Sequence, residues 1–420
     1  MLMGEWGCKM KRVVITGMGA LSSVGNNPQE MWSSLINKQS GIDYITNFDA
    51  SNLKVKLAGE VKNFHPEEFF NPNEIRKLDR SALLALVASK QAYLEANLPN
   101  GFDRDRFGVF IASGIGGIIT LEEEAKKALT KGPDRVSPFF VPNSIINLIG
   151  GQVAIFFNAK GPNIPVVTAC ASSTNAIGEA FNYIRYGKID LALCGGSEAP
   201  LSMLGVSGFS AMRALNTSSD KTSASIPFDK RRSGFVMAEG AGILMIEELN
   251  FALKRKAHIL AEIVGYGTNC DAYHITSPDP EAEGISKCMK LALDDANINY
   301  QDINYINAHG TSTVYNDKLE TLGIKKVFKD YAYSLPISST KSATGHALAA
   351  AGGIEAVISI MALRNNLIPP TINYQEKDED CDLDYTVNEA RKKPLNYCMS
   401  NNFGFGGQNA SLIFKKYLEG

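Results

Sequence analysis

IPVVTACASSTNAIGEAFNYIRYG, residues 164–187, is the stretch that decides the fold. It opens with a short apolar run that ends at Cys170, as a buried strand would. Apolar residues then recur at helical spacing until Gly187 ends the pattern; they are Ala176, Ile177, Ala180, Phe181 and Ile184. The stretch therefore predicts a strand that runs directly into a helix, with Cys170 at the junction.

Cys170 is a candidate nucleophile because of this position. Unpaired N–H groups and the dipole at a helix N-terminus favour an anion, so we expect a lowered thiol pKa. A buried structural cysteine explains the same pattern equally well, since free cysteine is among the most buried residue types. This stretch alone leaves both interpretations open.

Composition predicts a soluble globular protein with a sizeable core. The chain has 420 residues, of which 45% are hydrophobic and 20% charged, and its 37 glycines predict many tight turns. This length favours one large intertwined domain or two sub-domains. A net charge of −2 argues against nucleic acid as a partner, so an acidic partner would need a local basic patch.

Targeting and redox signals favour the cytoplasm. The seven cysteines form no CxxC pair, which predicts neither a disulfide framework nor a zinc site. The N-terminus reaches a strand-like VVIT without a signal-peptide core. The longest apolar segment, 343–363, contains His346 and Glu355, so we expect no membrane span.

Strand and helix patterns alternate along the chain and predict a largely parallel α/β sheet. Between 132 and 145, a stretch rich in Pro and Phe is expected to form an excursion or lid. The predicted strands cover 11–19, 107–112, 190–196, 240–249, 261–267 and 302–308, and the predicted helices cover 27–37, 80–96, 122–131 and 285–296.

A weak internal repeat links the two halves of the chain. PVVTACASSTNAIGEAF and LPISSTKSATGHALAAAGGIEAVISIMAL share a strand, a turn and a helix of small residues. Two facing halves would bring Cys170 and His346 to a shared centre. Chance similarity between α/β units is the alternative explanation.

Two of the five histidines lie in glycine-flanked loops after predicted strands. They are His309 in NAHGTST and His346 in ATGHALAA. A single histidine is more often structural than catalytic, but two at strand ends, together with a cysteine at a helix start, favour a catalytic site.

Lys341 and Glu355 are the expected charged pair of this site. Glu355 interrupts an apolar helix, and a buried carboxylate needs a partner. Glu355 is nine residues after His346. In an α-helix this separation corresponds to half a turn around the axis and roughly 13 Å along it, so contact between the two side chains is not expected. Lys341 or a cation is the better partner, and a solvated Glu355 on an exposed stripe is the alternative.

The glycine loop NFGFGGQN, residues 402–409, lets the backbone approach a ligand closely. Its N–H groups suit an oxyanion hole. No phosphate-loop pattern follows it, and the turn after the first strand lacks the third glycine of a dinucleotide fingerprint.

Four motifs together resemble a known family. They are ACASSTNAIG around Cys170, NAHGTST, STKSATGH with Lys341 and His346, and NNFGFGGQNA. They resemble the β-ketoacyl-[acyl-carrier-protein] synthases of type II bacterial fatty acid synthesis, which are condensing enzymes of the thiolase superfamily. DAYHITSPDP and PPTINY point to the elongation group known as synthase II.

The resemblance implies a thiolase-like α/β fold. In it, two related βαβαβαββ halves form a five-layered αβαβα arrangement, usually in a homodimer. The expected halves are 10–258, which carries the nucleophile, and 259–420, which carries both histidines, after an N-terminal extension at 1–9.

The resemblance also implies roles for the site residues. Cys170 matches the nucleophile that takes the acyl chain from acyl-carrier protein, and His309 and His346 match the pair that assists decarboxylation of malonyl-carrier protein. Lys341 and Glu355 match an ordering ion pair. Backbone N–H groups of Cys170 and Phe405 match the oxyanion hole, and Phe405 also resembles a gate.

Further positions match substrate, partner and ion contacts. Thr276, Ser277, Thr311, Thr313 and Phe403 match the phosphopantetheine tunnel, and Ile115 an acyl-pocket wall. Carrier-protein docking is expected at Arg213 by motif, and at Arg76, Lys77, Arg80, Lys126 and Lys127 by charge and position. No cofactor is required, but some members bind a monovalent cation, for which the matching shell is Asn307, Glu355, Ser400 and Asn401.

Three alternative functions remain. A thiolase would carry a second cysteine in the glycine loop, whereas Cys381 and Cys398 lie outside it. A catalytically silent chain-length factor would lack the nucleophile. A ketosynthase of a polyketide or aryl-polyene pathway is harder to separate, and Gln408 and GHALAAAGG, which depart from the usual family pattern, leave the acyl chain length open.

Overall fold

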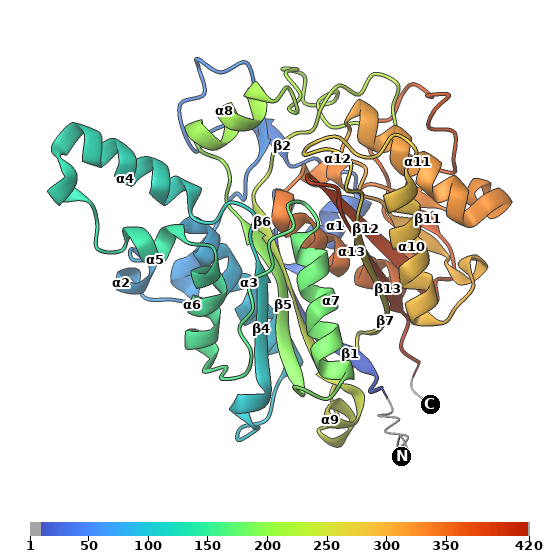
Figure 1. The fold of residues 1–420 in the computed structure, drawn as a ribbon, viewed down its shortest axis with the longest axis horizontal. Coiled ribbons are helices and arrows are strands. Elements are labelled where there is room, and N and C mark those ends of the chain that lie inside the picture. Colours follow the sequence, from blue (N-terminus) through green and yellow to red (C-terminus); the bar gives the residue numbers. More distant parts are fainter. Residues whose placement is uncertain (1–9, 419–420) are drawn as a thin grey trace, which may run out of the picture.

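The computed structural model describes residues 10–418, so the predicted extension at 1–9 lies outside the described residues. A nine-stranded sheet forms its centre, in the order β4-β5-β6-β1-β7-β13-β12-β8-β9 (Figure 1). The strands are β1 (Val13–Leu21), β4 (Phe107–Ala112), β5 (Leu191–Glu198), β6 (Gly240–Glu248), β7 (Ala261–Cys270), β8 (Tyr305–Asn307), β9 (Ile337–Ser338), β12 (Tyr397–Gly404) and β13 (Gln408–Lys415).

The sheet consists of two matching sets of strands that meet at β1 and β7. These two strands pair antiparallel, with Val13 opposite Ile263. The pairing is the same on both sides of these two strands. In the first half β1 pairs antiparallel with β6, β6 pairs antiparallel with β5, and β5 pairs parallel with β4. In the second half β7 pairs antiparallel with β13, β13 pairs antiparallel with β12, and β12 pairs parallel with β8. The expectation of a largely parallel sheet is therefore wrong, because the last two strands of each half, β5 with β6 and β12 with β13, pair antiparallel.

The order of elements supports the internal repeat. The second half runs β7, α10 (Glu283–Ala296), β8, α11 (Val314–Phe328), β9, α13 (Ala351–Asn365), β12 and β13, which is the expected βαβαβαββ order. The first half runs β1, α3 (Arg80–Ala96), β4, α6 (Asn147–Phe157), α7 (Ser172–Arg185), β5 and β6. Only its third strand is missing from this order.

The missing strand is the one predicted just before Cys170. Residues 164–167 form no regular strand, and Asn163 and Thr168 make only isolated bridges. Side chains from 163 to 167 alternate between exposed and half-buried. The prediction of a strand is therefore wrong, because the segment makes no continuous ladder with β4 or with another described strand.

Helices and strands alternate in five layers. α7 and α13 pack against each other and against strands of both halves. α3 covers the outer face of β1, β5 and β6, and α6 packs on α3 and β4. On the other side α10 covers β7 and β13, with α11 packed on α10. Figure 1 shows α7 between the two sets of strands.

α13 owes its apolar composition to this middle layer. Every residue from Ala351 to Leu363 is buried. The window Leu348–Asn365 is long and apolar enough to cross a membrane, but 89% of it is buried inside the protein. Because both of its faces contact strands, the helix has no polar stripe.

The remaining elements decorate this core. The helix α4 projects from the body as an arm (Figure 1). The predicted excursion at 132–145 packs against this helix. No residue of the excursion lines the cavity at Cys170, so the excursion is not a lid in this structure. The elements are α1 (Pro28–Ile36), β2 (Ile42–Tyr44), β3 (Leu57–Gly59), α2 (Pro72–Ile75), α4 (Ile118–Lys131), α5 (Phe140–Ser144), α8 (Met203–Ala211), α9 (Leu249–Lys254), α12 (Lys341–Thr344), β10 (Leu367–Ile368) and β11 (Arg391–Lys392).

Two facing glycines allow α13 to lie directly on β6. A Cβ atom on Gly242 would overlap the backbone of Gly353 and Ile354, and one on Gly353 would overlap the carbonyl of Gly242. This contact fixes the start of α13 against the sheet of the first half, and with it the loop that carries His346.

We expect Gly242→Ala to destabilise the protein by about 1–3 kcal/mol or more, because the methyl group overpacks a backbone contact that has no room to shift. Urea unfolding would measure this change. Gly208→Ala in α8 is the matched control, since its Cβ would meet nothing within 4 Å. Equal midpoints for the two variants would contradict the close contact.

Candidate active site

Cys170 lies in a tight turn two residues before α7 begins. Ala169 has a positive φ of 49°, and Ser172 Oγ donates to its carbonyl at 2.6 Å. The same hydroxyl accepts from Thr168 N at 2.8 Å. These bonds turn the chain sharply, so the Cys170 side chain leaves the helix axis and faces the neighbouring half.

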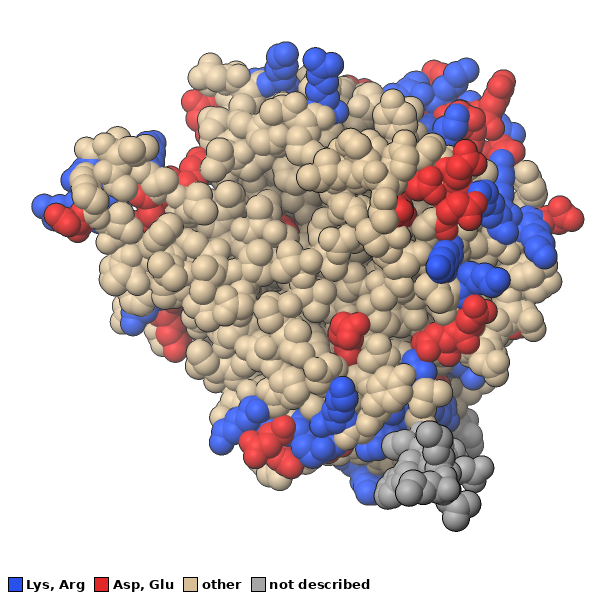
Figure 2. All heavy atoms as spheres, in the orientation of Figure 1, with Lys and Arg blue, Asp and Glu red and all other residues tan. Residues whose placement is uncertain are grey.

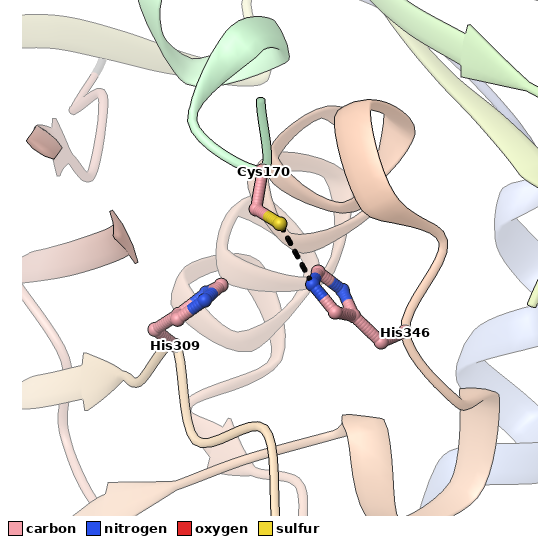
Figure 3. Close-up of side chains that lie close together, drawn as sticks. All are labelled: Cys170, His309 and His346. Atoms are coloured by element: carbon pink, nitrogen blue, oxygen red, sulfur yellow. Dashed lines mark hydrogen bonds between the residues drawn. The ribbon is translucent and has the colours of Figure 1, made fainter. Parts of the chain in front are cut away.

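His346 is held by backbone bonds between the two halves. Its N–H donates to Val236 O at 2.8 Å, and its carbonyl accepts from Ala238 N at 2.9 Å. Its Nε2 atom lies 3.1 Å from Cys170 Sγ, as Figure 3 shows. The meeting of these two side chains, predicted from the internal repeat, is therefore confirmed.

His309 completes the cluster from the end of β8. Its backbone N–H and that of Gly310 each donate to the buried carboxylate of Glu320 at 2.8 Å. Its ring lies 5.3 Å from that of His346 and nearly perpendicular to it. One donor atom from each of Cys170, His309 and His346 lies within 4.8 Å of the others, a spacing that a thiol–imidazole metal site would also have.

Burial controls the protonation of these three groups. It raises the pKa of Cys170 to about 12, with only partial opposition from the charge of Lys341. Burial and then Lys341 hold the pKa of both His309 and His346 well below the usual value. The expected lowering of the thiol pKa is wrong for this state, because desolvation outweighs the helix terminus. The resting pair is a neutral thiol and a neutral imidazole.

Lys341 and Glu355 form the predicted ion pair. Both side chains are buried, and Lys341 also donates to the carbonyl of His309 at 2.7 Å. The second oxygen of Glu355 accepts from Asn402 Nδ2 at 2.7 Å. The alternative of a solvated Glu355 is therefore excluded. Among the described residues, the Glu355 carboxylate makes no hydrogen bond to His346, as expected.

A cavity of about 490 Å³ leads to the cluster. Its lining includes Cys170, both histidines and the predicted gate Phe405. It also includes most of the substrate positions implied by the resemblance, namely Thr276, Ser277, Thr311, Thr313 and Phe403. Ile115 does not line it. Ile115 packs instead in an apolar cluster around Cys170 that includes Leu201 and Leu348.

The glycine loop closes one side of this cavity. Phe405 stacks on Phe209 with ring centroids 6.3 Å apart. A Cβ atom on Gly404 would lie only 3.0 Å from Cys170 N, so the loop and the Cys170 turn are in close contact. In the described chain, the N–H groups of Cys170 and Phe405 make no backbone hydrogen bond outside regular elements.

The family is decided by comparison with known proteins. A model of the β-ketoacyl synthase N-terminal domain matches residues 10–252, and one of the C-terminal domain matches residues 260–375. The chain belongs to the β-ketoacyl synthase family. It is a condensing acyltransferase with a thiolase-like fold.

Relatives of this β-ketoacyl synthase match along almost the whole chain. A 3-oxoacyl-[acyl-carrier-protein] synthase 2 from Staphylococcus aureus (strain N315) is 51% identical over 408 residues, covering 97% of this chain and 99% of the relative. The synthase 2 from Coxiella burnetii (strain RSA 493 / Nine Mile phase I) is 47% identical over 411 residues, with 97% and 99% covered.

Solved structures agree with the fold. A β-ketoacyl synthase from Burkholderia phymatum STM815 has a TM-score of 0.90 and 35% identity, covering 97% of this chain and all of its own. A type II PKS acyl-carrier protein in complex with its ketosynthase bound to the hexaketide (AntDE:AntF) also gives 0.90, with 34% identity and the same coverage.

The predicted docking residues of this synthase differ in their surroundings. Arg213 is exposed and lines the cavity, and Arg76, Lys77 and Lys126 are exposed. Lys127 pairs with Glu124 at 3.2 Å. Arg80 instead makes two bonds of 2.6 Å to the buried Glu239. Arg80 therefore neutralises a buried carboxylate, and its role in docking stays a prediction.

The implied cation shell is partly available. Asn307 and Ser400 are paired in register on β8 and β12, and their buried polar side-chain atoms have no hydrogen-bond partner among the described residues. Glu355 is already neutralised by Lys341, and Asn401 bonds Ser411 and Met289. Asn307 and Ser400 thus fit a small polar ligand or ion, whereas Glu355 and Asn401 could contribute only oxygens that already have partners.

Sequence reasoning missed two buried carboxylates near the site. Glu320 holds the backbone of His309, and burial raises its pKa to about 7. Glu198 binds Ser113 Oγ and the N–H groups of Gly114 and Ile115, and burial raises its pKa to about 7 as well. A glutamate at the end of an apolar run was the available signal for Glu198, whereas Glu320 lies in a mostly polar stretch that gives no such signal.

We expect the alkylation rate of Cys170 by iodoacetamide to rise about tenfold per pH unit between about pH 7 and 9, because the thiolate fraction grows in that proportion below a raised pKa. Mass spectrometry of the Cys170 peptide would measure it. A rate that does not change over this range would indicate a thiolate already formed at pH 7.

Proposed function

We propose that this β-ketoacyl synthase is a 3-oxoacyl-[acyl-carrier-protein] synthase 2 that elongates acyl chains by decarboxylative Claisen condensation. The observation that carries the proposal is the buried cluster of Cys170, His309 and His346 at one cavity. The near full-length likeness to synthases of that name supports the substrate class.

The first half-reaction loads the acyl chain on Cys170. The thiol attacks the thioester carbonyl of the acyl-carrier protein while its proton passes to His346 Nε2, 3.1 Å away. The oxyanion receives hydrogen bonds from the N–H groups of Cys170 and Phe405. The bond to the phosphopantetheine sulfur then breaks, and that sulfur leaves with the proton.

The second half-reaction forms the new carbon–carbon bond. Malonyl-carrier protein enters, its carboxylate leaves as CO₂, and the bonding electrons move into an enolate. Neutral imidazoles suit this step. His309 can donate an N–H toward the enolate oxygen without protonating it, and His346 can add a second N–H only after its ring hydrogen has moved to Nε2, the nitrogen that is the acceptor in the first half-reaction. The enolate carbon attacks the thioester on Cys170, the carbon–sulfur bond breaks, and the released thiolate takes up a proton from water.

The proposed partner is an acyl-carrier protein. Arg213 beside the cavity supplies a cation for an acidic partner, with Arg76, Lys77 and Lys126 as further exposed cations. The AntDE:AntF complex supports the class of partner, since it joins a ketosynthase to a carrier protein. A further cofactor has no role in the proposed steps, and a monovalent cation beside Asn307 and Ser400 would be structural.

A homodimer is the proposed assembly. The segment at 164–167 has a free edge, and Val167 is 48% exposed. Nearby helices expose Ile155, Phe156 and Tyr186. Figure 2 shows few charged side chains at the centre of the face that α6 and α7 occupy in Figure 1. A second copy pairing along the free edge would complete the missing third strand.

Location and domain division are also proposals. Free cysteines throughout the described part support the cytoplasm, where thiols stay reduced. The halves 10–258 and 259–420 are supported by the element order, which restarts at β7.

A polyketide ketosynthase is the second candidate. It is favoured by the likeness to AntDE:AntF and to the ishigamide ketosynthase/chain length factor, which has a TM-score of 0.92 and 33% identity. A turnover assay with malonyl-carrier protein and acyl-carrier proteins of graded length would separate the two. Repeated condensation without reduction of the product would favour the polyketide function.

We expect Cys170→Ala to reduce condensation by at least about a thousandfold, since no other described thiol lines the cavity. Product formation from malonyl- and acyl-carrier protein would measure it. Cys194→Ala is the matched control, because Cys194 is also buried but lies in β5, away from the cavity. Retained condensation in the Cys170 variant would refute the proposed function.

We expect light scattering to give twice the mass of one chain for the wild type. Ile155→Lys should shift the protein toward one chain mass, because it places a charge on the apolar face of α6. Leu253→Lys on α9 is the control, being exposed to 49% away from that face. A monomeric wild type would refute the homodimer.

A further inference from the structure

Asn402 joins three parts of the active site that belong to different elements. It is fully buried in β12. Its amide contacts Thr174 on α7, Glu355 on α13 and the ring of His309 after β8. No other described side chain bonds the Nδ1 atom of His309, since Lys341 and Glu320 reach only its backbone.

Both ends of the Asn402 amide have a defined orientation. The ion-paired carboxylate of Glu355 can only accept a hydrogen bond, so the group 2.7 Å from it is Nδ2. The oxygen Oδ1 accepts from the hydroxyl of Thr174. Gly352 packs beside this oxygen, where a Cβ atom would lie 2.8 Å from it. The amide therefore has neither the room nor the partners to turn over.

The second hydrogen of Nδ2 is available to His309. Nδ2 lies 3.4 Å from His309 Nδ1. An amide nitrogen is a donor only, so Nδ1 must act as the acceptor in this contact. A neutral imidazole carries one ring hydrogen, and an acceptor at Nδ1 leaves that hydrogen on Nε2.

We propose that Asn402 is a positioning residue that holds His309 in the tautomer with hydrogen on Nε2. The catalytic consequence rests on the proposed function: His309 then presents an N–H donor on the nitrogen not bonded to Asn402, where an enolate oxygen would form. Glu355, which pairs with Lys341, thereby also orients the amide that controls His309. Thr174 extends the same chain of contacts to the helix of the nucleophile.

The tautomer can be observed without turnover. In protein labelled with ¹⁵N in the histidine rings, His309→Gln identifies the His309 signals. The wild type should show an unprotonated Nδ1. In Asn402→Asp, which is isosteric but replaces the amide donor beside His309 with a carboxyl oxygen that can accept, the hydrogen should move to Nδ1. Thr174→Val leaves Glu355 to orient the amide, so this variant and Thr174→Ser should both retain the wild-type signals.

The two half-reactions separate positioning from general damage. Decarboxylation of malonyl-carrier protein by Asn402→Asp should fall by at least about tenfold, whereas acyl loading of Cys170, which depends on His346, should fall by less than about threefold. Asn216→Asp is the matched control, a buried asparagine bonded to Ser233 and Ser218. It should change neither rate nor the ring signals.

Two results would overturn the proposal. One is a protonated Nδ1 in the wild type, or the same His309 signals in Asn402→Asp as in the wild type. The other is an equal fall of both half-reactions. Because the ring spectrum requires no activity, it decides the role of Asn402 even if the wild type condenses no substrate, which would refute the proposed function alone.

Discussion

The packing of α7 and α13 in a shared middle layer is the constraint on which the rest of this protein depends. Each helix is covered by strands of both halves, and the two glycines Gly242 and Gly353 bring sheet and helix into backbone contact. The loops before the two helices carry Cys170 and His346. Their meeting at 3.1 Å is thus a consequence of how two repeated halves close on each other.

Burial then sets the chemistry of the site. Desolvation raises the pKa of the thiol and lowers that of both imidazoles, so all three groups rest uncharged. The one ion pair among them, Lys341 with Glu355, is anchored by the carbonyl of His309 and the amide of Asn402. Breaking such a pair would leave an uncompensated charge in the interior, which is strongly destabilising. A site of this kind donates hydrogen bonds to developing charge without carrying charge on its histidines.

Local sequence pattern predicted many elements closely. The helix at 80–96 and the strand at 107–112 have the predicted bounds, and α4 begins only four residues before the expected 122. Two expectations failed because they depended on neighbours. The segment before Cys170 has strand composition but no second partner strand, and the sheet is mixed because each half ends in an antiparallel pair.

The sequence by itself determined the chemical types at the site and their family. Cys170, His309, His346, Lys341 and Glu355 are visible as reactive residues in glycine-rich or apolar surroundings, and the internal repeat indicates that they meet. Only the tertiary structure decided their states and partners. In the folded protein Arg80 bonds Glu239, burial raises the pKa of Cys170 instead of lowering it, and Asn402 contacts the ring of His309. The physical reason is that solvent exclusion and contacts between distant segments depend on the whole fold, whereas composition and periodicity describe only neighbours along the chain.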